Sequence, residues 1–119
     1  MPKDRKDASV RLTPAFFHIL LTVAARPTHG YAIMQAVQER TRGTVKLGPG
    51  SLYWAIKRLV ESELLDEVDA PAREDDDRRR YYALTPFGRT LLKREVEILA
   101  DIVGYAESQK LIERVKASS

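Results

Sequence analysis

The chain has 119 residues, of which 44% are hydrophobic, so it is long enough to bury one core and short for two domains. Its 20 Lys and Arg against 17 Asp and Glu give a formal net charge of +3, which permits an anionic partner without requiring one. Cysteine is absent, which excludes disulfides, thiol catalysis and cysteine-ligated zinc. No apolar run approaches about 18 residues, so we expect a cytoplasmic protein with no membrane segment.

The N-terminal part of the chain predicts a charged arm followed by a buried helix. Residues 1–12 are mostly charged or small, so we expect a flexible N-terminal arm. Thr13 and Pro14 are typical of an N-cap and of the first helical position. The segment that follows is apolar around much of its circumference, which is typical of a core helix, and Pro27 ends it. His18, alone in the middle of this helix, is interpreted as a structural residue.

Two further helices follow, joined by a short link as in a helix-turn-helix. Residues 31–42 carry apolar side chains at helical spacing, and Gly43 is typical of a helix C-terminus. Gly48 and Pro49 are expected at the N-cap and first position of the next helix, which runs to about Ser62. The apolar stripe of that helix consists of Leu52, Ala55, Ile56 and Leu59.

The outward face of the 49–62 helix carries aromatic and basic side chains together. They are Ser51, Tyr53, Trp54, Lys57 and Arg58. A solvent-exposed helix rarely places Trp and Tyr beside Lys and Arg unless another molecule covers them. A helix inserted into a DNA groove needs donors for phosphates and base edges, with short side chains near its start. The pattern favours double-stranded DNA as a partner, and a basic, solvated helix face is the competing interpretation.

The second half of the chain predicts a hairpin and then a long helix. Residues 64–70 and 78–85 are expected to form two strands joined by a charged connection. Pro86 begins the last helix, whose apolar stripe continues at three- and four-residue steps to Val115. A small domain cannot cover so long a stripe, so we expect a second copy of the chain to pack on it. The expected interface residues are Leu92, Val96, Leu99, Ile102, Val103 and Ala106.

The sequence contains no convincing catalytic or metal-binding motif. The loop at Gly48 lacks the spacing and the lysine of a nucleotide-binding P-loop. His18 and His29 are the two histidines, too few for a convincing metal cluster. The three aspartates at 75–77 lie among arginines and are interpreted as a solvated hairpin tip. We therefore expect no enzyme activity, no metal and no cofactor.

Three blocks of the sequence resemble the PadR family of bacterial transcriptional regulators. They are PTHGYAIMQAV, LGPGSLYWAIKRL and RRRYYALTPFGRTLL, which keep the order and approximate spacing of the family. The long terminal helix fits the short, single-domain branch. The resemblance implies a mainly α fold with a small β-hairpin, in which residues 13–85 form a winged helix-turn-helix. It also implies that residues 86–117 form a C-terminal dimerisation helix.

The resemblance further implies a homodimer that represses transcription from a palindromic operator, with the 49–59 segment as the recognition helix. Ser51, Tyr53 and Lys57 match positions that commonly meet DNA in the family. The block that starts at His29 begins the second helix, where a structural role is at least as expected as a DNA contact. The candidate DNA-binding residues are Ser51, Tyr53, Trp54, Lys57 and Arg58 in the helix and Arg78, Arg79 and Arg80 in the wing.

Two residues depart from the family pattern, and other functions stay open. Glu63 stands where the family usually has the glycine that ends the recognition helix, and Trp54 is bulky for a DNA-facing position. The alternative function is a winged-helix protein-interaction module without DNA binding, in which Trp54 contacts a protein. Control by a small-molecule effector of unknown identity, held between dimer helices beside Tyr105 or Phe16, is also open.

Overall fold

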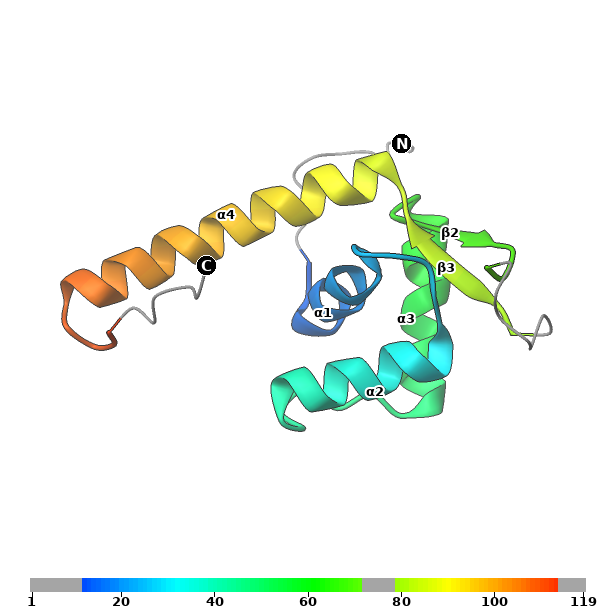
Figure 1. Cartoon of the computed structure of the whole chain (residues 1–119), viewed down its shortest axis with the longest axis horizontal. Helices are drawn as coiled ribbons and strands as arrows, with labels where there is room; N and C mark the ends of the chain where they lie inside the picture. Colours follow the sequence, from blue (N-terminus) through cyan, green and yellow to red (C-terminus); the bar gives the residue numbers. More distant parts are fainter. Residues whose placement is uncertain (1–11, 72–78, 114–119) are drawn as a thin grey trace.

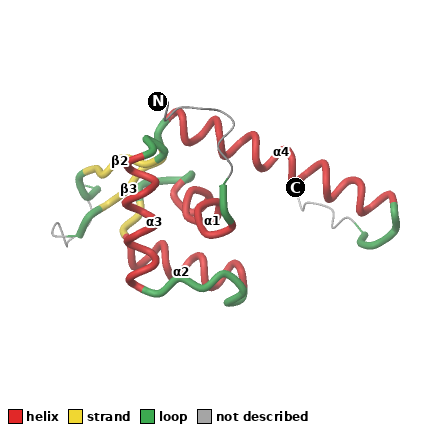
Figure 2. The backbone as a smooth tube through the Cα atoms, turned by 180° about the vertical axis from the view of Figure 1, so that it is seen from behind, coloured by secondary structure: helices red, strands yellow, loops and turns green. Residues whose placement is uncertain are grey.

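The computed structural model describes residues 12–71 and 79–113, so residues 1–11 of the arm predicted at 1–12 lie outside the described residues. The elements, in chain order, are α1 (Pro14–Val23), β1 (Thr28–His29), α2 (Gly30–Thr41), α3 (Pro49–Glu61), β2 (Leu65–Val68), β3 (Tyr81–Leu84) and α4 (Pro86–Ser108). Figures 1 and 2 show, from opposite sides, that α1, α2 and α3 gather together while α4 projects away from them. The β2–β3 wing lies on the side opposite to the free end of α4 (Figure 1). The predicted mainly α winged helix-turn-helix is confirmed.

Two threonine–proline pairs begin helices, as predicted. Thr13 Oγ1 accepts a hydrogen bond from the Phe16 amide at 3.1 Å, and proline follows in the first turn of α1. Thr85 Oγ1 accepts from the Gly88 amide at 2.8 Å in the same way at the start of α4. These caps satisfy amides that have no partner inside the helix. Local sequence therefore fixes where α1 and α4 begin.

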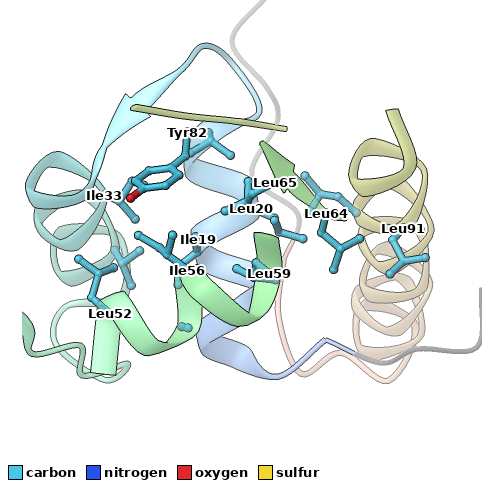
Figure 3. Close-up of a cluster of buried hydrophobic side chains, with 14 residues drawn as sticks. Ile19, Leu20, Ile33, Leu52, Ile56, Leu59, Leu64, Leu65, Tyr82 and Leu91 are labelled. Carbon is cyan, nitrogen blue, oxygen red and sulfur yellow. The ribbon is translucent and has the colours of Figure 1, made fainter. Parts of the chain in front are cut away.

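The hydrophobic core lies where the first three helices meet the sheet and the start of α4 (Figure 3). The four predicted residues of the α3 stripe are all buried, with at most 3% of each exposed. Truncating a large side chain in such a core costs about 2–5 kcal/mol. The core therefore holds α3 by one face and fixes which face points outward. Its fully buried side chains include Ile19, Leu20, Ile33, Leu52, Leu59, Leu65 and Leu91.

The sheet has three strands among the described residues, one more than the predicted hairpin. β1 pairs antiparallel with β3, which also pairs with β2, so the strand order is β1-β3-β2. Thr28 lies opposite Tyr82, and His29 lies opposite Tyr81. A strand of two residues has no alternating pattern to be recognised in a sequence, so only its pairing with β3 reveals it. This pairing ties the start of α2 to the wing.

The turn after α3 is joined to the start of α4. Glu63 has a φ of 64°, in the left-handed region, and the Leu64 amide donates to the Leu59 carbonyl at 2.9 Å. Thr85 Oγ1 donates to the Glu63 carbonyl at 2.7 Å, and the Thr85 amide donates to the Leu64 carbonyl at 3.2 Å. A Cβ on Gly88 would collide with the Leu64 carbonyl oxygen. The chain thus makes, with a glutamate, the turn conformation that glycine favours.

The helix α4 is shorter than the apolar pattern predicted. It ends at Ser108 after 23 residues, whereas the prediction extended it to residue 117. Lys110 has a φ of 63°, and the Leu111 amide donates back to the Ala106 carbonyl at 3.0 Å, which closes the helix. The predicted helix is therefore wrong for residues 109–113. Residues 114–117 of the prediction lie outside the described residues.

Candidate nucleic-acid interface

The helix α3 exposes the predicted DNA-reading side chains because its opposite face is buried in the core. With about 100° of rotation per residue, Trp54 and Lys57 point away from the buried stripe. Tyr53 lies on the flank toward the wing, and Ser51 and Arg58 lie on the flank toward α1. All five residues are exposed, and Tyr53 and Trp54 keep 50% and 59% of their surface accessible. We call these five side chains the α3 outer face.

The first turn of α3 is small and open. Gly48 is the N-cap, Pro49 is the first helical residue, and the Gly48 amide donates to Ser51 Oγ at 3.0 Å. A Cβ added to Gly48 or Gly50 would meet no atom within 4 Å. Packing against the described residues therefore does not explain why either position is a glycine. Their small size leaves the amides at the start of α3 open to close approach by an anion.

On the α1 flank, Trp54 packs against a side chain that the sequence did not point to. The Trp54 ring stacks on Phe16, with 6.2 Å between ring centroids and 28° between planes. The guanidinium carbon of Arg58 lies 5.7 Å from the centroid of the Trp54 ring. A cation–π contact at an exposed site contributes about 0.5–1 kcal/mol. Trp54 therefore positions Arg58 while being held by α1.

On the wing flank, a cavity of about 410 Å³ opens between the start of α2, α3 and the start of β3. Its lining brings Tyr53 together with Arg79 and Arg80, and Arg78 lies outside the described residues. The Tyr53 hydroxyl covers Gly30, because a Cβ there would lie 2.7 Å from that oxygen. Guanidinium and phenol groups can all donate hydrogen bonds, so this lining suits an anion.

Arg80 contacts an acidic side chain of the neighbouring strand. Its Nε atom lies 3.8 Å from an oxygen of Glu67, and 74% and 51% of the two side chains are exposed. An exposed ion pair of this kind contributes about 0–1 kcal/mol and is screened by salt. Arg80 can therefore leave Glu67 and bind a phosphate with little loss of stabilising free energy.

His29 lies within hydrogen-bonding distance of two donors, and its neutral ring can accept from only one of them. Its Nδ1 atom accepts from the Ala32 amide at 3.2 Å and caps α2, while Arg79 Nη1 lies 2.8 Å from its Nε2 atom. A neutral imidazole has a single acceptor nitrogen, and arginine can only donate. The cap on α2 and a hydrogen bond from Arg79 therefore cannot form together. Of the two roles open to His29, the structure shows the helix cap.

His18 ties α1 to α2, in agreement with its interpretation as a structural residue. Arg40 of α2 donates to Thr22 Oγ1 at 2.9 Å and lies 3.3 Å from His18 Nδ1. Burial, followed by the charge of Arg40, lowers the pKa of His18 below its ordinary value of 6.5. The neutral imidazole is therefore the favoured form in the folded protein at neutral pH.

The helix α4 carries apolar side chains that the rest of the described chain leaves exposed. Leu92 is an exception among the residues expected at the interface, because it is only 4% exposed and belongs to the core of the same chain. Ala106 is half-buried. A contiguous exposed apolar surface marks a site of interaction. The remaining expected residues are between 41% and 57% exposed and are Val96, Leu99, Ile102 and Val103.

The described ranges contain neither a cluster of metal ligands nor a membrane-spanning helix. Within residues 12–71 and 79–113, no three His, Asp or Glu side chains come together in a way that could hold a metal ion. In the same two ranges, no helix is both long and apolar enough to cross a membrane.

The short link between α2 and α3, the exposed face of α3 and the following wing define a winged helix-turn-helix protein. A sequence profile of the transcriptional regulator PadR-like family matches residues 19–94. The chain belongs to this family of transcriptional regulators, as the three sequence blocks predicted.

Similar proteins were found both by sequence and among solved structures. The chain is 40% identical over 95 residues to an uncharacterized 37.1 kDa protein in transposon TN4556 of Streptomyces fradiae, a match that covers 80% of this chain but 26% of that protein. The fold is similar to a PadR family transcription regulator from Clostridium difficile R20291, with a TM-score of 0.66, 25% identity, and 81% and 97% of the two chains covered. ZitR of Lactococcus lactis, a zinc-responsive MarR family member, shares the fold alone, with a TM-score of 0.65, 21% identity, and coverage of 94% and 70%.

Proposed function

We propose that this protein is a sequence-specific, double-stranded DNA-binding transcriptional regulator that acts as a homodimer. The observation that carries the proposal is the α3 outer face, where hydrogen-bonding, aromatic and basic side chains share one exposed surface. The core holds the opposite face of the same helix, so this surface is presented rigidly. Arg79 and Arg80 lie beside it across the wing-side cavity. Membership of a family of transcriptional regulators supports the same function.

In the proposed mechanism, α3 enters the major groove, which is wide enough for one helix. Arg58, steadied by Trp54, reads the edge of a guanine, and Lys57 neutralises a phosphate. The wing arginines, including Arg78, follow the neighbouring backbone. The small residues at the start of α3 allow the helix to approach a phosphate closely. No catalytic group or cofactor takes part.

The proposed dimer forms through the exposed apolar side chains of α4. Residues 13–85 of each copy then bind one half-site, and α4 holds the two copies together. Two-fold symmetry makes the operator a palindrome, with half-sites one turn of DNA, about 34–36 Å, or a multiple of it apart. A dimer seated on such an operator inside a promoter excludes other proteins from it, so the regulator acts as a repressor.

Selection of duplexes from a randomised pool tests the proposal. At about 150 mM salt, where charges are screened over about 8 Å, purified protein should enrich a palindrome. With roughly 6–10 phosphate contacts, affinity for that palindrome should fall about 10³- to 10⁵-fold between about 50 and 200 mM salt. A folded protein that enriches no sequence and responds weakly to salt would contradict the proposal. That result would favour the protein-interaction module, in which Trp54 contacts a protein.

Two substitutions on α3 separate base reading from phosphate binding. Arg58→Ala should weaken binding to the selected palindrome by about 1–3 kcal/mol and relax the sequence preference at one position. Lys57→Ala should weaken binding to all duplexes alike and lower the salt slope by about 1. Lys93→Ala removes the same charge from the exposed surface of α4 and serves as the control. Identical behaviour of the Arg58 and Lys57 variants would show that the two roles are assigned wrongly.

A further inference from the structure

Trp54 differs from the other side chains of the α3 outer face in its small capacity for hydrogen bonding. Its polar group is the indole N–H, which can donate one hydrogen bond and accept none. The side chain lies one helical turn before Arg58, the residue proposed to read a guanine, and 59% of it is accessible. Trp54 therefore presents an apolar surface where its neighbours on α3 present hydrogen-bonding groups.

Two contacts hold the Trp54 ring in place without burying it. Phe16 of α1 stacks against the ring, and the 6.2 Å between the two centroids lies within the range of about 4.5–7 Å that aromatic pairs prefer. The guanidinium carbon of Arg58 lies 5.7 Å from the centroid of the same ring. A side chain that is already held loses little conformational entropy when it binds. A contact made by the accessible part of the ring is therefore favourable.

The major groove of DNA offers one good partner to an apolar ring. The base edges there present hydrogen-bond donors and acceptors, together with the C5 methyl group of thymine. A ring that covers a donor or acceptor leaves it without a hydrogen bond, which costs free energy. A ring that covers the methyl group instead removes apolar surface from water on both molecules. The chemistry of Trp54 is therefore matched to thymine.

The distance between Trp54 and Arg58 restricts the position of that thymine. Guanine and thymine belong to different base pairs, and successive base pairs are about 3.4 Å apart along the duplex. A separation of 5.7 Å is shorter than two such steps, so the two side chains face neighbouring base pairs. We infer that Trp54 is a specificity-determining residue, which recognises the C5 methyl of a thymine next to the guanine bound by Arg58. This inference deepens the proposed DNA-binding function and rests on it.

A contact with the methyl group also makes the protein sensitive to methylation of cytosine. Cytosine that is methylated at C5 carries the same group at the same place in the major groove as thymine. A cytosine opposite Trp54 lacks the apolar partner, and its methylation supplies one. The α3 outer face is therefore able to distinguish methylated from unmethylated DNA at this base pair.

Replacing thymine with deoxyuridine tests the methyl contact alone, because deoxyuridine keeps the base pairing and the O4 acceptor and lacks the methyl group. The duplex is the palindrome selected from the randomised pool, with the thymines of one half-site replaced one at a time. Replacement of the thymine beside the guanine that Arg58 reads should weaken binding about fourfold, as expected for one methyl group. A half-site with no thymine at that place, or an affinity that the replacement leaves unchanged, would overturn the inference.

Matched variants show whether Trp54 is the residue responsible. Trp54→Ala should bind the thymine and deoxyuridine duplexes equally, and Trp54→Phe, which keeps a smaller apolar ring, should retain part of the preference. Tyr53→Ala removes a ring of similar exposure, 50%, from the other flank of α3, so it should weaken both duplexes and keep the fourfold ratio. A ratio of two affinities does not report a general loss of stability, and circular dichroism checks that each variant folds. A full preference in Trp54→Ala would assign the methyl contact to another residue and refute the role of Trp54.

Methylated cytosine gives an independent measurement. When the same thymine is changed to cytosine, with guanine opposite, methylation at C5 should strengthen binding of the unsubstituted protein about fourfold and leave Trp54→Ala unaffected. An equal response of the two proteins would contradict the inference. Enrichment of no palindrome would overturn the proposed function and this inference together, whereas a palindrome that is bound equally with and without the methyl group would overturn the inference alone.

Discussion

Replacing Glu63 with glycine should stabilise the folded protein. Glu63 ends α3 with a φ of 64°, and an L residue in the left-handed region is disfavoured by about 1–2 kcal/mol. Glycine avoids this strain but loses about 0.4–1 kcal/mol more conformational free energy on folding. The net gain expected for Glu63→Gly is therefore about 0.5–1 kcal/mol. Glu63→Ala keeps the strain and removes the side chain, so it measures the contribution of the carboxylate separately.

Urea unfolding of the two variants gives the comparison. Glu63→Gly should have a higher free energy of unfolding than Glu63→Ala by about 0.5–1 kcal/mol, equivalent to a rise in Tm of about 2–4 °C for a chain of this size. All samples need the same protein concentration, because the proposed dimerisation would couple stability to concentration.

The opposite substitution is available at the end of α2. Gly43 has a φ of 78°, and a Cβ added there would meet no atom within 4 Å, so Gly43→Ala changes conformational preference without a clash. It should lower the free energy of unfolding by about 0.5–1 kcal/mol. If Gly43→Ala destabilises the protein and Glu63→Gly is no more stable than Glu63→Ala, the account of the turn at Glu63 is refuted.

Other expectations concern the dimer, acid stability and the wing-side cavity. Val103→Asp places a charge on the apolar surface of α4 and should shift the protein from dimer to monomer in analytical ultracentrifugation, while Lys93→Gln makes the same change of charge elsewhere on α4 and should not; a dimeric Val103→Asp would contradict the proposed interface. The folded pKa of His18 is lowered from 6.5, so its contribution to stability is complete above that pH and is lost as the pH falls toward the folded value. His18→Gln should therefore flatten the dependence of unfolding free energy on pH below about 6.5, and an unchanged slope would assign the dependence to other groups. Gly30→Ala puts a Cβ 2.7 Å from the Tyr53 hydroxyl and should displace this flexible side chain, so it should weaken duplex binding about as much as Tyr53→Ala with little change in Tm. Full affinity in Gly30→Ala would place Tyr53 outside the DNA contact.

The helical part of the fold could be predicted because its signals are local. The caps at Thr13 and Thr85 and the apolar stripe of α3 depend on residues within a few positions of one another. The strand β1 could not be predicted, because two residues become a strand only by pairing with β3. The end of α4 was mistaken because apolar spacing continues through Leu111, whereas the backbone reverses at Lys110.

The candidate site was predictable to the same extent. Helical periodicity was enough to place Tyr53 and Trp54 on the exposed side of α3. It could not show that Phe16 supports Trp54 or that Gly30 lies beneath Tyr53, because both contacts join elements that are distant in sequence. At Glu63 the residue type argued against the left-handed backbone that the structure has. A residue that disfavours this conformation still adopts it when the surrounding hydrogen bonds require it.

The junction between α3 and α4 acts as an elbow in the proposed dimer. Thr85 binds the carbonyls of Glu63 and Leu64, and Gly88 lies against Leu64, so a few residues set the direction of α4 relative to the recognition helix. Twenty-three helical residues make an arm about 34 Å long, and a change of about 5° at the elbow moves its far end by about 3 Å. This displacement is close to the rise of one base pair, about 3.4 Å. In the proposed dimer, this junction would set the spacing of the half-sites from outside the α3 outer face. A substitution at Gly88 would then change which operator spacing is preferred before it changed how a single half-site is read.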